Sequence, residues 1–194
     1  GVAKRLGPTG SLPDDEGLMF LDIHHVQLPE IFTGQTTTVG GTHAKTGFTK
    51  SVRVNGKGDA HLAIELILAY FASMRRPITW MHTDGANELK GTKVVAIARA
   101  KSIRITTTTV GSSRKNRQEP QWRVLMAIVR KLIQRAKLPF NFWGWAWDDA
   151  EEGRNLLPSR EPPHDCALGR LMSNETTTVK PTGTHRRPWG NLCY

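Results

Sequence analysis

Cysteine is scarce in this sequence, whose 194 residues include Cys166 and Cys193 and no Cys-x-x-Cys pair. A disulfide framework or a structural zinc site needs more ligands at closer spacing, so we expect both thiols to be reduced and structural. His24 and His25 are adjacent, and neighbouring side chains on a strand point to opposite faces, which makes them poor joint ligands. No apolar run reaches the roughly 18–20 residues that cross a bilayer, so we expect no membrane segment.

Acidic residues are also in the minority. The chain has 27 Lys and Arg against 17 Asp and Glu, a formal net charge of +10 at pH 7. This excess favours an anionic partner, most often nucleic acid, although a merely soluble basic protein would show it too. Binding to a membrane surface is less favoured, because the basic residues do not cluster on one long amphipathic helix.

The composition, 38% hydrophobic and 23% charged, is typical of a globular domain. Residues 1–17, rich in Gly, Pro and charge, predict an extended N-terminal arm, and residues 18–157 predict the core. Residues 158–194, with five prolines and little periodicity, predict an irregular C-terminal extension. The chain starts at Gly1 without a signal-like segment, so we expect a processed product or an excised domain.

The pattern of apolar residues predicts an α/β fold. Strands are expected at 18–26, 35–40, 46–54, 76–84 and 103–110, and helices at 58–74, 90–102, 119–139 and within 140–159. Asp59 could cap the first helix, and packing into the core explains at least two of Trp143, Trp145 and Trp147 more simply than base stacking. Three antiparallel strands followed by αβαβα predict a mixed five-stranded sheet with helices on both faces.

Three carboxylates occupy the ends of predicted elements. Asp22 lies on the first strand, Asp84 ends the fourth, and Glu119 begins the long helix. If the first and fourth strands are neighbours, Asp22 and Asp84 lie together, and the helix start can bring Glu119 to them. Three such carboxylates are hard oxygen ligands for Mg²⁺ or Mn²⁺. Each also has an ordinary explanation: a hydrogen-bonded strand acid, a turn residue, and an acid at a helix N-terminus.

Several stretches match one family in the right order. They are "DGANEL" (84–89), "SIRI" (102–105), "LPFNFWGWAW" (138–147), "RNLLPS" (154–159) and "HRRPWGNLCY" (185–194), together with Asp22 and Glu119. Over roughly residues 18–194 the chain resembles the catalytic core of integrases from copia-type LTR retrotransposons. The resemblance implies an RNase H-like fold. It also implies that Asp22, Asp84 and Glu119 bind two Mg²⁺ ions and join DNA 3′ ends to target DNA in the nucleus.

The stretch before Glu119 departs from that family. It reads "SSRKNRQEP" (112–120), without the family's glycine, and Glu119 follows Asp84 by 119 − 84 = 35 positions, one fewer than usual. Within it, Arg114, Lys115 and Arg117 are candidate phosphate contacts, or else a solvated charged turn. Such departures are what we would expect of a repurposed copy.

Three functions therefore stay open. The first is a metal-dependent DNA strand transferase using Mg²⁺ or Mn²⁺. The second is a catalytically silent, domesticated domain without a cofactor, which binds RNA and other proteins in a ribonucleoprotein such as the ribosome of a mitochondrion or another organelle. The third, least favoured by the charge, is a protein scaffold, because related integrase cores form oligomers.

Overall fold

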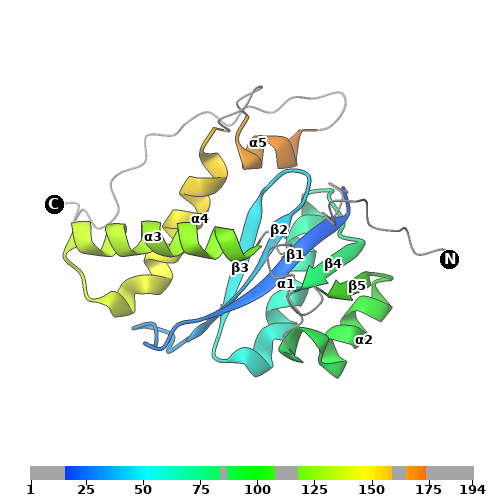
Figure 1. Cartoon of the computed structure of the whole chain (residues 1–194), viewed down its shortest axis with the longest axis horizontal. Coiled ribbons are helices and arrows are strands. Elements are labelled where there is room, and N and C mark those ends of the chain that lie inside the picture. Colours follow the sequence, from blue (N-terminus) through cyan, green and yellow to red (C-terminus); the bar gives the residue numbers. More distant parts are fainter. Residues whose placement is uncertain (1–15, 84–86, 108–117, 159–164, 174–194) are drawn as a thin grey trace.

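The computed structural model describes residues 16–83, 87–107, 118–158 and 165–173, and a five-stranded sheet lies at its centre (Figure 1). The strands are β1 Leu18–His25, β2 Thr37–His43, β3 Thr49–Val54, β4 Trp80–Thr83 and β5 Arg104–Thr107. Their order is β3-β2-β1-β4-β5. The first three strands pair antiparallel, whereas β4 pairs parallel with β1 and β5 pairs parallel with β4. The predicted mixed sheet, with its first and fourth strands as neighbours, is confirmed.

Helices cover both faces of this sheet, as predicted. They are α1 Ala60–Ser73, α2 Thr92–Ala100, α3 Gln118–Ala136, α4 Trp143–Leu156 and α5 Ala167–Met172, with short 3-10 turns η1 Lys57–Asp59, η2 Asn87–Lys90 and η4 Phe140–Phe142. Figure 1 shows α3 and α4 on one side of the sheet and α1 and α2 on the other. The start of α3 lies over the middle of β1 in the same view.

One hydrophobic core lies between the sheet and α1. Alternate residues of β1, Met19 and Leu21, are fully buried there against Ile64, Ile67 and Phe71 of α1. One detail of the predicted helix 58–74 is corrected: Asp59 makes no side-chain capping bond. Leu62 and Leu66 of α1 are half exposed, at 50% and 59%, and lie outside this core.

A second core lies between α3 and α4. Apolar residues three and four positions apart on α3, including Leu125, Met126 and Val129, pack there against Trp143 and Trp147 of α4. Both tryptophans are fully buried, whereas Trp145 is 56% exposed, so the prediction that at least two of the three pack into the core is confirmed.

Within its described residues, 158 and 165–173, the extension predicted to be irregular includes the short helix α5. Ala167 and Leu171 of α5 join the core on the α1 side of the sheet. Cys166 is buried and its thiol is free, as expected, while Cys193 lies outside the described residues. Among the described helices none is long and apolar enough to cross a membrane.

Candidate active site and groove

Asp22 lies where three elements meet. It is half-buried on β1, opposite Gly40 of β2. On its other side β1 runs parallel to β4, and the last pair of that ladder is Leu21 and Thr83. The Asp22 carboxylate accepts a hydrogen bond from its neighbour, Ile23 N–H, at 2.8 Å, and another from the indole Nε1–H of Trp122, on α3, at 2.9 Å.

The first turns of α3 are fastened to the sheet beside Asp22. The side chain of Gln118, the first residue of α3, is fully buried and accepts a hydrogen bond from the Thr42 hydroxyl of β2. One turn later Trp122 bonds to Asp22. The ring of Trp122 covers Gly40, where an added Cβ would lie 2.2 Å from its Cη2 atom. Gly40 is therefore needed at this position because a larger residue would push the indole away.

An aromatic stack continues from Trp122 along the sheet. The ring centroid of His24 lies 5.9 Å from that of Trp122 and 5.8 Å from that of Trp147, and the two indoles are 5.3 Å apart. Burial lowers the pKa of His24, and the nearby positive charges of His25 and Arg130 lower it further. The imidazole is therefore neutral at pH 7 and packs as an aromatic ring. The two adjacent histidines make different contacts: the His24 ring packs against Trp122 and Trp147, whereas His25 is exposed and its ring faces the Thr37 hydroxyl at 3.2 Å.

For two of the three predicted carboxylates, Asp84 and Glu119, the structure describes no side chain. Asp84 follows Thr83, the last residue of β4, and lies outside the described residues. Glu119 is the second residue of α3, and its side chain lies outside them. The basic loop with Arg114, Lys115 and Arg117 lies outside them as well. The part of the chain that is described holds no group of three His, Cys, Asp or Glu side chains suited to a metal ion, so the three-carboxylate site stays a prediction.

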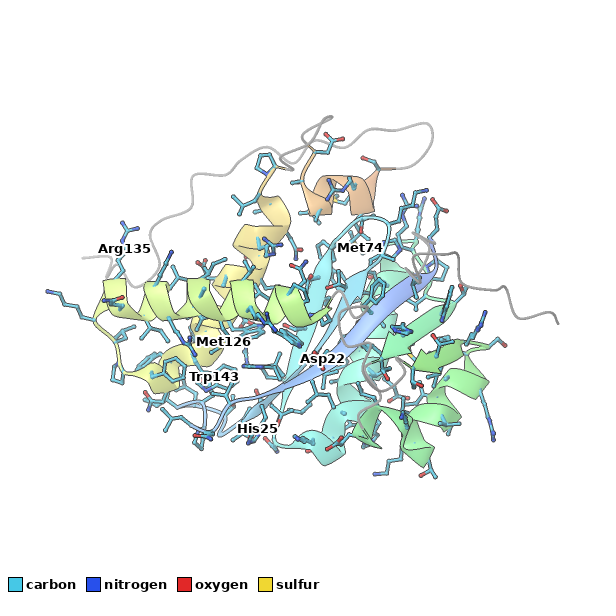
Figure 2. All side chains as sticks on the ribbon, viewed as in Figure 1. Asp22, His25, Met74, Met126, Arg135 and Trp143 are labelled. Atoms are coloured by element: carbon cyan, nitrogen blue, oxygen red, sulfur yellow. The ribbon has the colours of Figure 1, made fainter. Side chains whose placement is uncertain are left out.

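A groove of about 810 Å³ runs from Asp22 along β1 and the segment after it, as far as Leu28. Its other wall is α3, including Met126, which Figure 2 shows on the helix above β1. Arg123 and Arg130 of α3 also line this groove, and both are exposed. They are seven positions apart, two helical turns or roughly 10 Å along the axis, so they lie on the same side of the helix.

These two arginines were missed in the sequence, although the signal was present. The apolar stripe predicts the helix at 119–139, but it does not by itself indicate on which side of the helix each basic residue lies. Arg123 and Arg130 fall on the border of that stripe, which places them at a groove rather than on the outer surface. The Trp122–Asp22 bond had no comparable signal, because the two residues are 100 positions apart.

Of the three predicted ligands, only Asp22 has a described side chain. Its carboxylate oxygens are the kind of ligand that Mg²⁺ and Mn²⁺ prefer. Oδ1 accepts a hydrogen bond from Ile23 N–H and Oδ2 accepts one from the Trp122 indole, and these two bonds orient the carboxylate.

No protein-family model matches the sequence, and a search of curated proteins finds no match. Among solved structures, the fold is similar to a chain of the simian T-cell lymphotropic virus intasome, which was determined in complex with the PP2A regulatory subunit B56 gamma. The TM-score is 0.68 at 14% sequence identity, and the match covers 88% of this chain. It spans 60% of the length of the viral chain.

This similarity, together with the sheet order, identifies the fold as RNase H-like and integrase-like. The predicted fold class is confirmed. At 14% identity the match shows the fold alone, and its viral origin does not single out the copia type.

Proposed function

We propose that this chain is an integrase-type, nucleic-acid-binding domain of copia-like ancestry. Its proposed activity is metal-dependent DNA strand transfer, with Asp22, Asp84 and Glu119 as the ligands of Mg²⁺ or Mn²⁺. The observation that carries the proposal is the convergence of β1, which holds Asp22, the end of β4, which directly precedes Asp84, and the start of α3, which includes Glu119.

The register between β1 and β4 supports the proposal. The last pair between β1 and β4 is Leu21 and Thr83, and the residues that follow these two in the chain are the predicted ligands Asp22 and Asp84. The hydrogen bond from Trp122 to Asp22 draws the first turns of α3, and with them the backbone of Glu119, toward β1. Positions 62 and 97 residues from Asp22 (84 − 22 and 119 − 22) thus follow or belong to elements that contact β1.

A bound pair of Mg²⁺ ions would activate the attacking oxygen and stabilise the leaving oxygen of a phosphodiester. The chain's own residues do the positioning. Asp22 presents oxygens held by Ile23 N–H and the Trp122 indole. Asp22 lies at one end of the groove, so a nucleic-acid strand bound there would extend along β1.

The groove supports a phosphate-bearing substrate. Arg123 and Arg130 project from α3 on the side that lines it, and arginine pairs with phosphate through charge-assisted hydrogen bonds. Such contacts to the backbone position a nucleic acid without reading its sequence. The formal charge of +10 adds long-range attraction.

The test measures strand transfer and DNA binding on the same variants. Asp84→Asn and Glu119→Gln should lose strand transfer in Mg²⁺ or Mn²⁺ while still binding DNA, because each removes a ligand charge and leaves the groove intact. Arg130→Ala should weaken DNA binding and reduce the slope of log affinity against log salt by about 1, as expected for one lost phosphate contact.

Arg135→Ala is the matched control for the groove. Arg135 lies on the last turn of the same helix (Figure 2) and does not line the groove. Its removal takes away one exposed positive charge and should alter the salt slope less than Arg130→Ala does. Unchanged strand transfer in both carboxylate variants would rule out the proposed roles.

A silent domain in a ribonucleoprotein, for example in an organelle, is the second candidate. The stretch before Glu119, with its altered length and missing glycine, favours it. Here RNA would be the anionic partner. Its test is to purify the native complex and measure its RNA content, and a chain that runs alone and free of RNA would exclude it.

A further inference from the structure

We propose that Trp122 is a positioning residue for the metal site, acting through the hydrogen bond that its indole donates to Asp22. The proposal rests on the function proposed above and adds a residue to it. Trp122 would not touch the ion or the substrate, and its role would be to hold one ligand and the start of one helix in a fixed relation.

A single hydrogen bond can hold these two parts together because its donor and acceptor lie on different elements. The acceptor, Asp22, belongs to β1, the strand at the middle of the sheet. The donor lies on α3, three residues after Glu119, so the bond sets the distance between the strand and the first turns of the helix. A shift of the helix start would break the bond, and a turn of the Asp22 carboxylate would break it too.

The indole itself has little freedom to move. Trp122 is 5% exposed, and its ring lies over Gly40, the residue opposite Asp22 on β2. On its other sides it contacts His24 and Trp147. A rigid donor holds its acceptor in one orientation, whereas a flexible donor would turn with it.

Residues that orient metal ligands from outside the coordination sphere have large effects, and their loss typically costs about 10- to 100-fold in metal affinity or activity. The N–H group is the part of Trp122 that performs this role. Phenylalanine keeps an aromatic ring in the stack and removes the donor, so Trp122→Phe separates positioning from packing.

The neighbouring Trp147 provides a matched control. Its indole is in the same stack and also donates a hydrogen bond of 2.9 Å, but to the Ser51 hydroxyl of β3. Trp147→Phe therefore removes the same chemical group at the same bond length without touching Asp22. The two variants should lose similar amounts of stability and differ in their effect on the ion.

The experiment titrates Mn²⁺ into the 194-residue chain and follows the free ion by electron paramagnetic resonance. Trp122→Phe should raise the half-saturating Mn²⁺ concentration about 10-fold, with binding restored at higher Mn²⁺. Trp147→Phe should change it less than about 2-fold, because its indole donates to Ser51 and not to the proposed ligand Asp22. As a readout independent of the ion, the Trp122 indole N–H resonance, assigned by its loss in Trp122→Phe, should shift in Asp22→Asn, and that of Trp147 should not.

Four outcomes overturn the inference, and they are distinguishable. If Trp122→Phe binds Mn²⁺ with wild-type affinity, or if the two tryptophan variants weaken Mn²⁺ binding equally, Trp122 has no positioning role. Neither result contradicts the metal site. If the Trp122 indole N–H resonance does not shift in Asp22→Asn, the hydrogen bond between Trp122 and Asp22 is absent. If Asp22→Asn binds Mn²⁺ as the wild type does, the proposed metal site itself fails, and the role of Trp122 fails with it.

Discussion

On one face of the sheet Met19, Leu21 and Val39 pack against the aliphatic and aromatic side chains of α1. On the other face, the strand residues that meet α3 and α4 are mostly small or polar. These are Asp22 and His24 of β1, Gly40 and Thr42 of β2, and Thr49, Ser51 and Arg53 of β3. Leu18 and Phe20 of β1 belong to a separate buried apolar cluster. Where α3 and α4 cover the strands, a hydrogen-bonded layer therefore lies opposite the apolar layer of the α1 face.

The helices of the polar face donate indole hydrogen bonds to β1, to β3 and to the segment that follows β1. Trp122 donates to Asp22, Trp147 donates to Ser51, and Trp143 donates to the carbonyl of Leu28, each at 2.9 Å. Each of these side chains fills space as a large apolar group and also places a polar atom at a defined point. The polar face thus gains the directional contacts that a site requires.

The two faces therefore contribute differently: the α1 face mainly stabilises the fold, and the α3 face mainly positions the residues of the site. Burial of a large apolar side chain contributes roughly 1.5–3 kcal/mol, whereas a typical hydrogen bond adds a net of about 0.5–1.5 kcal/mol. We expect substitutions on the α1 face to unfold the protein. Conservative substitutions on the α3 face should instead displace the site while leaving the fold in place.

Adjacent residues of β1 test this division most strongly. Leu21 is fully buried on the α1 face, and Leu21→Ala should lower the free energy of unfolding by about 2–5 kcal/mol, because it leaves a cavity in the core. Asp22→Asn, one residue along and facing α3, keeps the size of the side chain but only one of the two oxygens that accept from Ile23 N–H and Trp122. It should lower the free energy of unfolding by about 1 kcal/mol, because one hydrogen bond is lost, while abolishing the proposed metal binding.

Urea unfolding followed by circular dichroism measures both values. The comparison fails if Asp22→Asn destabilises the chain as much as Leu21→Ala does. In that case the α3 face would be carrying as much of the fold's stability as the α1 face.

Adjacent glycines of β2 give a second, smaller contrast. A Cβ at Gly40 would lie 2.2 Å from a ring atom of Trp122, on the α3 face. A Cβ at Gly41 would lie 2.4 Å from Met19 Sδ, on the α1 face. Methionine adapts to such a change more easily than a ring held in a stack, so Gly40→Ala should cost about 1–3 kcal/mol and Gly41→Ala less.

Thermal unfolding of the two variants measures this difference, and the indole N–H resonance of Trp122 should move in Gly40→Ala alone. Equal losses, with an unmoved Trp122 resonance in both, would mean that the ring is less confined than its contacts indicate.

The sequence predicted the element order because the local signals are strong. The apolar run Leu18–Leu21 and the three- and four-residue spacing from Trp122 to Ile133 each have one natural interpretation. By contrast, β2 reads Thr-Thr-Val-Gly-Gly-Thr-His, which alternates too weakly to say which side meets which helix. The helix α5 has six residues within a proline-rich region, too few for a periodic pattern.

The site was predicted in part for the same reason. The positions of Asp22, Asp84 and Glu119 at element ends could be derived from local patterns and a family resemblance. The register of Leu21 against Thr83 could not, because strand pairing depends on packing across the whole sheet. Nor could the bond from Trp122 to Asp22, since it requires Gly40 to be opposite Asp22 and Trp147 to lie behind the ring.

The smallest expected effect concerns a carboxylate on the polar face that lies away from the site. Glu151 of α4 is 6% exposed, and its carboxylate accepts a hydrogen bond from Ser51 and lies 3.5 Å from Lys50 Nζ. Burial raises the pKa of Glu151 above its usual range, against the opposing effects of Lys50 and Ser51. The folded protein therefore holds the proton to higher pH than the unfolded chain does.

The wild type should lose stability as pH rises from about 4.3, the ordinary glutamate pKa, through the raised pKa of Glu151. Glu151→Gln has no such proton to lose. Its stability relative to the wild type should therefore increase over that window, as measured by urea unfolding at several pH values. Glu152→Gln, on the exposed side of α4, controls for the loss of one negative charge. A constant difference between the two variants across pH would mean that the Glu151 carboxylate is stabilised as fully in the fold as in water, and that this face tolerates buried charge better than its burial indicates.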